Sequence, residues 1–558
     1  MKIKRVIPFL LALCFVLSAC QHNDPGEQSG ADAAVSIENV TQKYDQPYTM
    51  TTSESGKGIL LNRGQIPVIM TSALLRADLL VNADFLEPSE MEDYFAIARE
   101  TNLNTLELTV MWSQIEPEKG QYDFSALDVY LNYAKKYGLK LNLVWYGSMV
   151  DGETHTANVP AYISRDPETY SCLMDLFDYA NFGRCRIMDW ADPDLLERES
   201  QAVWHMMNHV YAWNQSNEKY DPVIMVQIGQ GADRFQRWRV DAYDVVDAQG
   251  QPMAQEQAWS MVHTYLNTMA KAVKYSAYKA LTRVEFCEQT AVVNYVRDVR
   301  KLEFVDIVAP TYLHEISSTK NGIKSFTDEY ADMFIMNAEN WASDANHRQI
   351  LATFGMGAGG YVSYQLSSPN YYPESPNGAL YGRYDPEGAT LAEKFPQKGE
   401  RAERTAAVNS ALLRAYVAVA NAPRSLFATF GLNNLLNGKT GDERIQNIYL
   451  SNGILLSYSN PEDTMGFGAY DGNYIYVWSS KDATLRVTNC TLTVCQKGAF
   501  DENGEWVSQG NVTLEGNNTL QCQAGEVYRI RVGDISQLPA ASELKAEGYL
   551  PPLDSIRG

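Results

Sequence analysis

Short apolar runs alternate with segments of helical period from about residue 60 to residue 425. Each run has the length of a strand buried on both faces, and the segments between them repeat apolar residues at helical spacing. Repeated strand–helix units of this kind build a parallel sheet, and eight of them are the number that closes a (β/α)8 TIM barrel of the α/β class. The eight runs are residues 66–70, 104–110, 139–145, 223–228, 283–287, 305–310, 333–337 and 360–364.

The pattern changes after Pro423, following a helix-like run over residues 400–422 that we expect to be the last outer helix. Short alternating runs are then separated by turn residues, and Asp501-Glu502-Asn503-Gly504 predicts a hairpin. We therefore predict a barrel over residues 57–428, an antiparallel β-sandwich-like domain over residues 429–535, and a tail over residues 536–558.

The N-terminus has the pattern of an export signal. Lys2, Lys4 and Arg5 precede an apolar run over residues 6–17, which is shorter than the roughly 20 residues that span a bilayer. Leu17-Ser18-Ala19-Cys20 resembles a bacterial lipobox, and a plain secretory signal is the alternative. We expect residues 1–20 to be a lipoprotein signal peptide and residues 21–56 a flexible tether. Lipidation of Cys20 would anchor the protein to a membrane of the bacterial cell envelope, in the periplasm or on the surface.

Composition changes this picture in two ways. The formal net charge of −22 makes a phosphate backbone a poor partner, so we expect no nucleic acid. Six cysteines remain beyond the signal, of which Cys172 and Cys185 are close enough in sequence to staple one loop, whereas spacing assigns no pairing to the others. No cysteine and histidine cluster has the spacing of a zinc site, so we expect neither a metal nor a cofactor.

Active sites of such barrels lie at the carboxyl ends of the strands. The segments that follow the predicted strands resemble those of clan A glycoside hydrolases, namely the β-galactosidase-like families 35 and 42. The resemblance extends over residues 60–425 and rests on Trp-x-x-x-Glu-Pro-x-x-Gly-x-Tyr-Asp-Phe at residues 112–124 and on segments 159–167, 305–312 and 336–341. It implies a pair of catalytic carboxylates, and it places the nucleophile at Glu339.

The second carboxylate is missing from its expected place. In the family the fourth strand ends in Gln-(Val/Ile)-Glu-Asn-Glu, whereas this chain reads Gln227-Ile228-Gly229-Gln230-Gly231, so the acid/base position is a glycine. Asp233 is the nearest replacement, and a carboxylate separation of roughly 6.5–9.5 Å would then favour inversion of configuration. Glu153 or Glu315 from another loop is a second possibility, and a barrel that only binds glycan is a third.

Aromatic side chains at the strand ends suit the apolar faces of sugar rings, although some of them will pack in the core. Polar and charged neighbours suit the hydroxyl groups, and His155 is a further polar candidate. The expected substrate-binding residues are Arg76, Trp112, Trp145, Tyr146, Gln230, Tyr312, His314, Trp341 and Tyr364. The sequence thus predicts a glycoside hydrolase whose partner is an oligo- or polysaccharide. Its alternatives are a catalytically inactive glycan-binding surface lipoprotein and a purely structural envelope lipoprotein.

Overall fold

The structure is a computed structural model of the whole chain. It describes residues 44–82, 86–147, 149–151, 158–166, 168–170, 172–175, 185–229, 245–246, 254–287, 302–311, 316–340, 346–368, 379–430, 445–459, 464–516 and 518–536.

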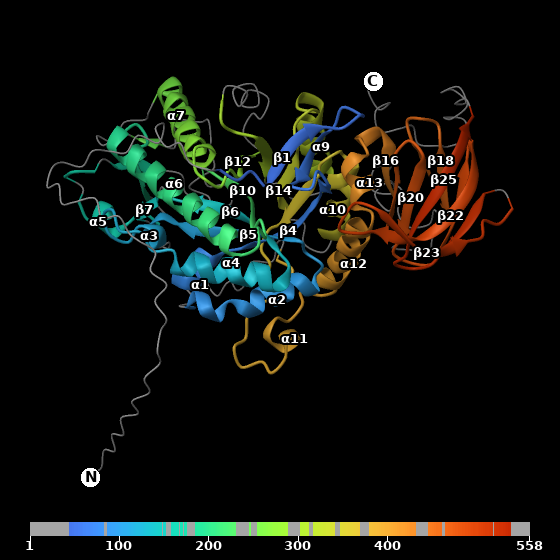
Figure 1. Cartoon of the computed structure of the whole chain (residues 1–558), viewed down its shortest axis with the longest axis horizontal. Helices are drawn as coiled ribbons and strands as arrows, with labels where there is room; N and C mark the ends of the chain where they lie inside the picture. Colours follow the sequence, from blue (N-terminus) through green and yellow to red (C-terminus); the bar gives the residue numbers. More distant parts are fainter. Residues whose placement is uncertain are drawn as a thin grey trace, which may run out of the picture. The chain divides into compact units, whose positions relative to one another are not determined.

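Eight strands form one parallel sheet in the order β13-β12-β10-β6-β5-β4-β15-β14, and its two end strands lie side by side (Figure 1). The sheet therefore curves into the predicted (β/α)8 barrel. Its strands are β4 (Met70–Leu75), β5 (Thr105–Met111), β6 (Lys140–Tyr146), β10 (Val223–Gln227), β12 (Leu281–Cys287), β13 (Ile307–Thr311), β14 (Met336–Asn340) and β15 (Gly360–Ser363). Strands β5 and β6 pair without a shift in register, and Leu106 of β5 lies opposite Leu141 of β6.

Helices connect the strands and cover the outside of the barrel. They are α1 (Ala77–Asn82), α2 (Glu92–Glu100), α3 (Trp112–Ile115), α4 (Ser125–Tyr137), α5 (Ala161–Ser164), α6 (Pro193–Ser216), α7 (Gln255–Lys274), α9 (Ile316–Glu329), α10 (Asn346–Gly355), α11 (Leu391–Lys394), α12 (Arg401–Arg414) and α13 (Tyr416–Asn421). Two helix ends follow from local chemistry. Asp192 accepts hydrogen bonds from two amides at the start of α6, and Gly138 ends α4 in the left-handed region at φ +66°.

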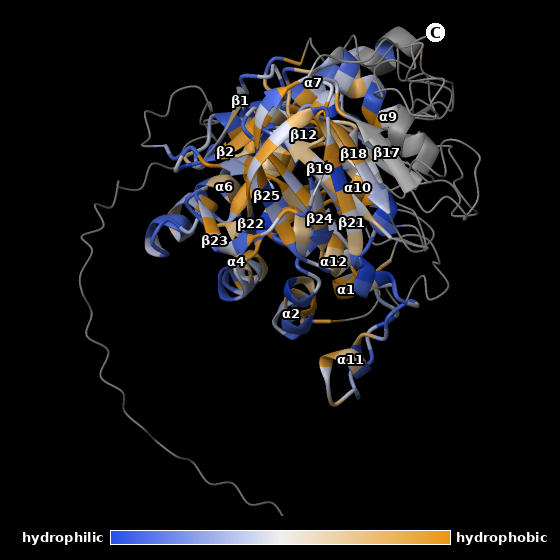
Figure 2. Cartoon of the chain, turned by 90° about the vertical axis from the view of Figure 1, so that its right-hand side faces the viewer, coloured by the Kyte–Doolittle hydropathy of each residue, from blue (hydrophilic) through white to orange (hydrophobic). Residues whose placement is uncertain are grey.

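The single outer helix expected over residues 400–422 is two helices, because α12 ends at Arg414 and α13 begins at Tyr416. Figure 2 shows apolar residues on the strands and on the inward sides of the helices. No helix in the described part of the chain is long and apolar enough to cross a membrane.

A small antiparallel sheet of β1 (Tyr48–Thr52), β2 (Gly58–Asn62) and β3 (Pro67–Val68) covers the amino-terminal end of the barrel. Tyr48 and Leu60 pack there against interior residues such as Met336. The expectation of a first barrel strand at residues 66–70 is wrong, since β3 pairs antiparallel with β2 and the barrel begins at β4. The expected tether over residues 21–56 also ends too late, because β1 is ordered within it.

A second small sheet has the order β11-β8-β9-β7 and comprises β7 (Met149–Asp151), β8 (Cys172–Asp175), β9 (Cys185–Met188) and β11 (Val245–Val246). In its β8–β9 pair, Cys172 lies opposite Met188 and Cys185 opposite Asp175. The two cysteines are therefore three residues apart along the ladder, about 10 Å, which exceeds the reach of a disulfide. A Cys172–Cys185 disulfide, which their closeness in sequence allowed, therefore does not fit this register.

The C-terminal region is a β sandwich of two antiparallel sheets (Figure 1). The larger sheet has the order β16-β19-β20-β25-β22-β23, with β16 (Phe427–Phe430), β19 (Gly466–Tyr470), β20 (Tyr474–Ser479), β22 (Cys490–Phe500), β23 (Trp506–Val512) and β25 (Val527–Ile535). The smaller has the order β17-β18-β21-β24, with β17 (Ile445–Tyr449), β18 (Leu455–Ser459), β21 (Ala483–Thr488) and β24 (Thr519–Cys522). The predicted hairpin joins β22 to β23, and Gly504 occupies its left-handed position at φ +79°.

Strands β19 and β20 of the larger sheet are buried on both faces. Ile475 and Val477 of β20 face the smaller sheet, where they pack with Leu485. Tyr476 and Trp478 of the same strand instead belong to the apolar cluster formed with α10, α12 and α13. The sandwich is therefore continuous with the barrel's helical layer through one apolar core. Cys490, Cys495 and Cys522 are buried in the sandwich as free thiols.

Candidate active site

Glu339 lies within β14, the seventh barrel strand, rather than after it as the sequence suggested. Asn337 and Asn340 both contact the helical layer outside the barrel, through Thr353 and the backbone of Asn346 respectively. Asn337 and Asn340 thus both face the outer helices, although two residues, Ala338 and Glu339, lie between them. The pairing register with β15 also shifts between Asn337 and Asn340. This is a β-bulge, a device that redirects a side chain. Glu339 lies within this bulge, near the carboxyl end of β14, and is 1% exposed.

A charged cluster occupies the barrel interior among Glu107 of β5 and Arg283 and Glu285 of β12. The Arg283 guanidinium lies 2.6 Å from Oε2 of Glu107 and donates to Oε1 of Glu285 at 3.0 Å. Its Nη1 also lies 3.5 Å from the sulfur of Met336 on β14. Burial raises the pKa of Glu107 against the opposing charge of Arg283. Burial alone would lower the pKa of Arg283, but the charges of Glu107 and Glu285 outweigh it and raise that pKa.

Arg76 follows the first barrel strand, as expected for a substrate contact, but it is buried and paired. Its Nε and Nη2 donate to the two oxygens of Asp78 at 2.9 and 2.7 Å. Asp78 also accepts from the Thr109 hydroxyl at 2.7 Å, and the guanidinium lies 5.6 Å from the ring centre of Tyr146. The structure thus brings two predicted site residues, Arg76 and Tyr146, together at the ends of β4 and β6.

The Trp-x-x-x-Glu-Pro motif builds a loop. The Trp112 indole is fully buried and donates to Glu116 at 2.9 Å. Glu116 also accepts from the amide of Gly120 at 2.8 Å and from Arg198 of α6 at 2.9 Å. The sugar-stacking role expected for Trp112 is therefore wrong, because its ring holds the loop after β5 and offers no exposed face.

Trp145 likewise faces away from the interior. Its indole donates at 2.8 Å to Glu199 of α6, which also accepts from the Tyr265 hydroxyl of α7 at 2.8 Å. Asn142 and Tyr146 of the same strand face inward, so the alternation of β6 places Trp145 under the helices. Its expected role as a sugar platform is wrong for that reason. Burial raises the pKa of Glu199 to about 8, against the two hydrogen bonds that it accepts.

The remaining expected residues divide into two groups. Tyr364 follows β15 and packs in the interior cluster with Ala338, on the same side of the barrel as Glu339. The others lie outside the described residues: Asp233, Gln230, Tyr312, His314, Trp341, Cys20, and the alternatives Glu153, His155 and Glu315.

The end of β10 is described as far as Gly229. Gln227, its last residue, is fully buried, and neither side-chain amide atom has a hydrogen-bond partner within the described segments. Gly229 then turns the chain in the left-handed region at φ +74°, a conformation that glycine adopts at low cost. The strand thus ends with a polar group in the interior, directly before the segment that carries Gln230 and Asp233.

Sequence reasoning missed Glu107, Arg283, Glu285 and Glu199. The sequence pointed to three of them, because Glu107, Arg283 and Glu285 are charged residues within otherwise apolar strands. Charges are rarely buried without a partner, so their positions favoured mutual pairing. Glu199 gave no such signal, because a glutamate in an amphipathic helix is normally exposed.

Comparison with known proteins agrees with this architecture. The model of the β-galactosidase family, glycoside hydrolase family 42, matches residues 85–269, and the model of a domain of unknown function, DUF4978, matches residues 261–436. No curated protein matches this sequence. The family 42 match covers the first half of the barrel, including the motif at residues 112–124 and strand β10, and ends before Glu339.

Three solved structures illustrate the similarity. Exo-β-1,4-mannosidase Op5Man5 from Opitutaceae bacterium strain TAV5 has 16% identity, covers 67% of this chain and 64% of its own, and gives a TM-score of 0.45. The cold-adapted β-galactosidase from Rahnella sp. R3 has 14% identity, with coverages of 64% and 57% and a TM-score of 0.42. The β-glucosidase from Thermotoga maritima in complex with azafagomine has 12% identity, with coverages of 61% and 97% and a TM-score of 0.41.

The chain spans slightly less than two thirds of the mannosidase. The eight-stranded barrel and the family match at residues 85–269 are independent observations that agree. The chain therefore carries a (β/α)8 barrel, and residues 85–269 within it resemble the β-galactosidases of glycoside hydrolase family 42.

Proposed function

We propose that this protein hydrolyses glycosidic bonds of an oligo- or polysaccharide, with Glu339 as the nucleophile or general base. The observation that carries the proposal is the buried position of Glu339 near the carboxyl end of β14, at a shift in the register with β15, from which we infer that its side chain faces the barrel interior. A glutamate needs only placement to act as a nucleophile, since it is ionised near pH 7 by default.

The interior charge also supports this chemistry. Glu107, Glu285 and Glu339 are three carboxyl groups, and Arg283 is the cation that pairs with two of them. The positive charge of Arg76 does not change the net charge of this group, because Arg76 is paired with Asp78. Glycoside hydrolysis passes through an oxocarbenium-like, positively charged transition state. Among the described residues of the interior, acidic groups outnumber basic ones, and such an excess favours a positive charge.

Replacing Glu339 tests the proposal. Glu339→Gln keeps the shape of the side chain, and we expect it to lower kcat on a panel of aryl β-galactosides, β-mannosides and β-glucosides by roughly 10²–10⁴-fold, with KM little changed. Glu502→Gln on the exposed β22–β23 turn is the matched control and should leave kcat unchanged. Unchanged turnover in Glu339→Gln would contradict the assignment.

The two possible roles of Glu339 are separable. If it is a nucleophile, Glu339→Ala with added azide should form a glycosyl azide of inverted configuration, because azide occupies the space of the lost carboxylate. If Glu339 is a base that activates water, the wild-type product itself has inverted configuration. Product stereochemistry by proton NMR distinguishes these outcomes.

We propose Asp233 as the general acid, because it is the first carboxylate after the position where the family glutamate is replaced by Gly231. Asp233→Asn should lower kcat on substrates with poor leaving groups by about 10²–10⁴-fold. It should spare 2,4-dinitrophenyl glycosides, whose leaving group needs no proton. An equal loss on both substrate types would exclude this role.

A catalytically inactive glycan-binding surface lipoprotein is the second candidate. The replacement of the family acid/base residue by Gly231 favours it. In that case wild-type protein shows no turnover on any glycoside of the panel, whereas calorimetry detects oligosaccharide binding that Glu339→Gln preserves. In either case we propose carbohydrate as the partner and a lipid on Cys20 as the envelope anchor. Cys20→Ser should then release the protein from the membrane fraction.

A further inference from the structure

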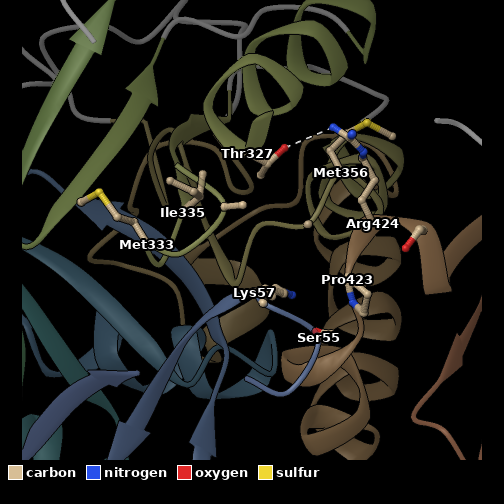
Figure 3. Close-up of a pocket in the computed structure, with 12 residues that line it drawn as sticks. Ser55, Lys57, Thr327, Met333, Ile335, Met356, Pro423 and Arg424 are labelled. Carbon is tan, nitrogen blue, oxygen red and sulfur yellow. Dashed lines mark hydrogen bonds between the residues drawn. The ribbon is translucent and has the colours of Figure 1, made fainter. Parts of the chain in front are cut away.

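A cavity of about 190 Å³ lies beside the segments that lead into the amino-terminal ends of β14 and β15 (Figure 3). Its walls come from the segments that precede β2, β14 and β15, and from the link that leads from α13 into β16. It therefore lies between the amino-terminal end of the barrel and the start of the sandwich. The lining is mostly apolar, with Met333, Ile335, Met356 and Pro423, and it carries the cationic side chains Lys57 and Arg424.

Among the described residues, the buried Lys57 ammonium has no acidic partner. Its Nζ donates to the backbone carbonyls of Val419 and Ala422 at the end of α13, at 3.3 and 3.2 Å. An ammonium has three donors, so one remains after these two bonds. Within the described segments no carboxylate forms an ion pair with Lys57, and the side chain is 7% exposed. Burial alone lowers its pKa to about 7.

The neighbouring charges do not supply the missing partner. Asp328 of α9 lies 2.8 Å from Arg424 and also pairs with Lys324 of the same helix. Arg424 donates to the hydroxyl of Thr327, which also lines the cavity (Figure 3). Glu54 and Asp332 on the adjoining turns are exposed and do not pair with Lys57.

The cavity is held in a fixed shape. The amide of Gly58, next to Lys57, donates to the carbonyl of Ala331 at 2.8 Å. A Cβ added at Gly58 would lie 2.1 Å from the carbonyl carbon of Met333, so the two backbones touch. Ser55 donates to the carbonyl of Asn421 at 3.2 Å and fixes the same turn to α13. The cavity is thus a preformed site.

We propose that this cavity binds a small organic carboxylate with an apolar body, whose carboxylate pairs with Lys57. A buried cation is stable when it is paired, and Lys57 lines the cavity, so an anion bound there supplies the pairing. The apolar lining suits a hydrocarbon body, and a 150 Å³ cavity is known to hold benzene, so a ligand of benzoate or hexanoate size fits. The site is independent of the glycosidase assignment.

The test uses full-length protein and isothermal calorimetry with benzoate and hexanoate as probes. We expect both to bind, and Lys57→Met to weaken binding by about 10- to 100-fold, as expected for loss of a charge-assisted hydrogen bond. Lys119→Met at an exposed position is the control and should bind like wild type. Benzyl alcohol, hexanol and inorganic phosphate should bind at least tenfold more weakly than the carboxylates.

Proton linkage provides a second measurement. Carboxylate binding favours charged Lys57, so at pH 7.5 wild-type protein should take up a fraction of a proton, measured in buffers of different ionisation enthalpy, whereas Lys57→Met should take up none. Absence of binding by either carboxylate, equal binding of the neutral alcohols, or unchanged affinity in folded Lys57→Met would each overturn the proposal. Glu339→Gln should bind the probes normally, which separates this site from the glycosidase site.

Discussion

At the scale of single residues, the most informative groups are acids and bases that the fold removes from water. Glu199 and Lys57 are both buried, and burial moves their pKa values in opposite directions, to about 8 and about 7 respectively. Each shift favours the neutral form, because the low-polarity surroundings oppose charge. These two residues should therefore impose opposite pH dependences on stability.

Glu199 should make the protein less stable as the pH rises from 4.5 to 8. In that range the folded state keeps the proton on Glu199, whereas the unfolded state, with a pKa near 4.5, has lost it. The free energy of unfolding should thus fall by up to about 1.4 kcal/mol per pH unit. Glu199→Gln keeps an acceptor for Trp145 and Tyr265 and should remove this slope in denaturant titrations at pH 5–8. A slope equal to that of wild type would refute the argument, and exposed Glu502→Gln serves as the control.

Lys57 should have the opposite effect at higher pH. Between pH 7 and 10.5 the unfolded state holds a proton that the folded state has lost, so stability should rise with pH across that window. Lys57→Met removes the titrating group and should flatten the rise, measured by urea denaturation between pH 7 and 10. A rise that persists in Lys57→Met would assign it to another group.

At the scale of elements, the decisive features are places where one residue changes the direction or spacing of the backbone. The bulge in β14 is one, since it inserts an extra residue between Asn337 and Asn340, next to Glu339. The approach of β2 to the loop before β14 is another, and it depends on the absence of a side chain at Gly58.

Gly58→Ala should destabilise the protein by about 1–3 kcal/mol, because the added methyl group meets the backbone of Met333, which cannot rotate away. Gly516→Ala is the control, since a Cβ there has no atom within 4 Å. Thermal and urea unfolding of both variants would measure the difference. Equal stabilities would mean that the β2 turn moves freely away from the barrel.

At the scale of the whole molecule, the described barrel and sandwich share one core. Ile350 of α10 and Leu412 of α12 are clustered with Phe467 and Trp478 of the larger sheet. Arg414 of α12 also donates to Glu526, next to β25, at 2.9 Å. The sandwich therefore supports the barrel's last helices, whatever further role it has with carbohydrate.

Phe467→Ala should lower the stability of barrel and sandwich together, by about 3–5 kcal/mol, because it leaves a cavity in the shared core. We expect calorimetry and tryptophan fluorescence to show one shifted transition. Val487→Ala, in the core between the two sheets, is the comparison. A transition of the barrel that keeps its wild-type midpoint in Phe467→Ala would show that the two parts unfold independently.

The sequence by itself determined the fold class. Buried parallel strands and amphipathic helices have distinct periods, so the eight-strand barrel and the following antiparallel sandwich were predictable from local pattern alone. The hairpin at Asp501–Gly504 was predictable for the same reason, because its turn chemistry is local. The limits of single strands were not predictable in this way. The error at residues 66–70 arose because an apolar run does not reveal which strand it pairs with.

Only the tertiary structure decided which side each residue faces. The bulge at Glu339 depends on pairing with β15 and on contacts to α10, neither of which the sequence displays. Trp145 is an aromatic residue of the kind that stacks on sugars, but its indole donates to Glu199, 54 residues further along the chain. The protonation state of Lys57 depends on its burial among residues that are distant in the sequence. Orientation and solvent exposure are properties of the packed molecule, because distant segments supply the neighbours.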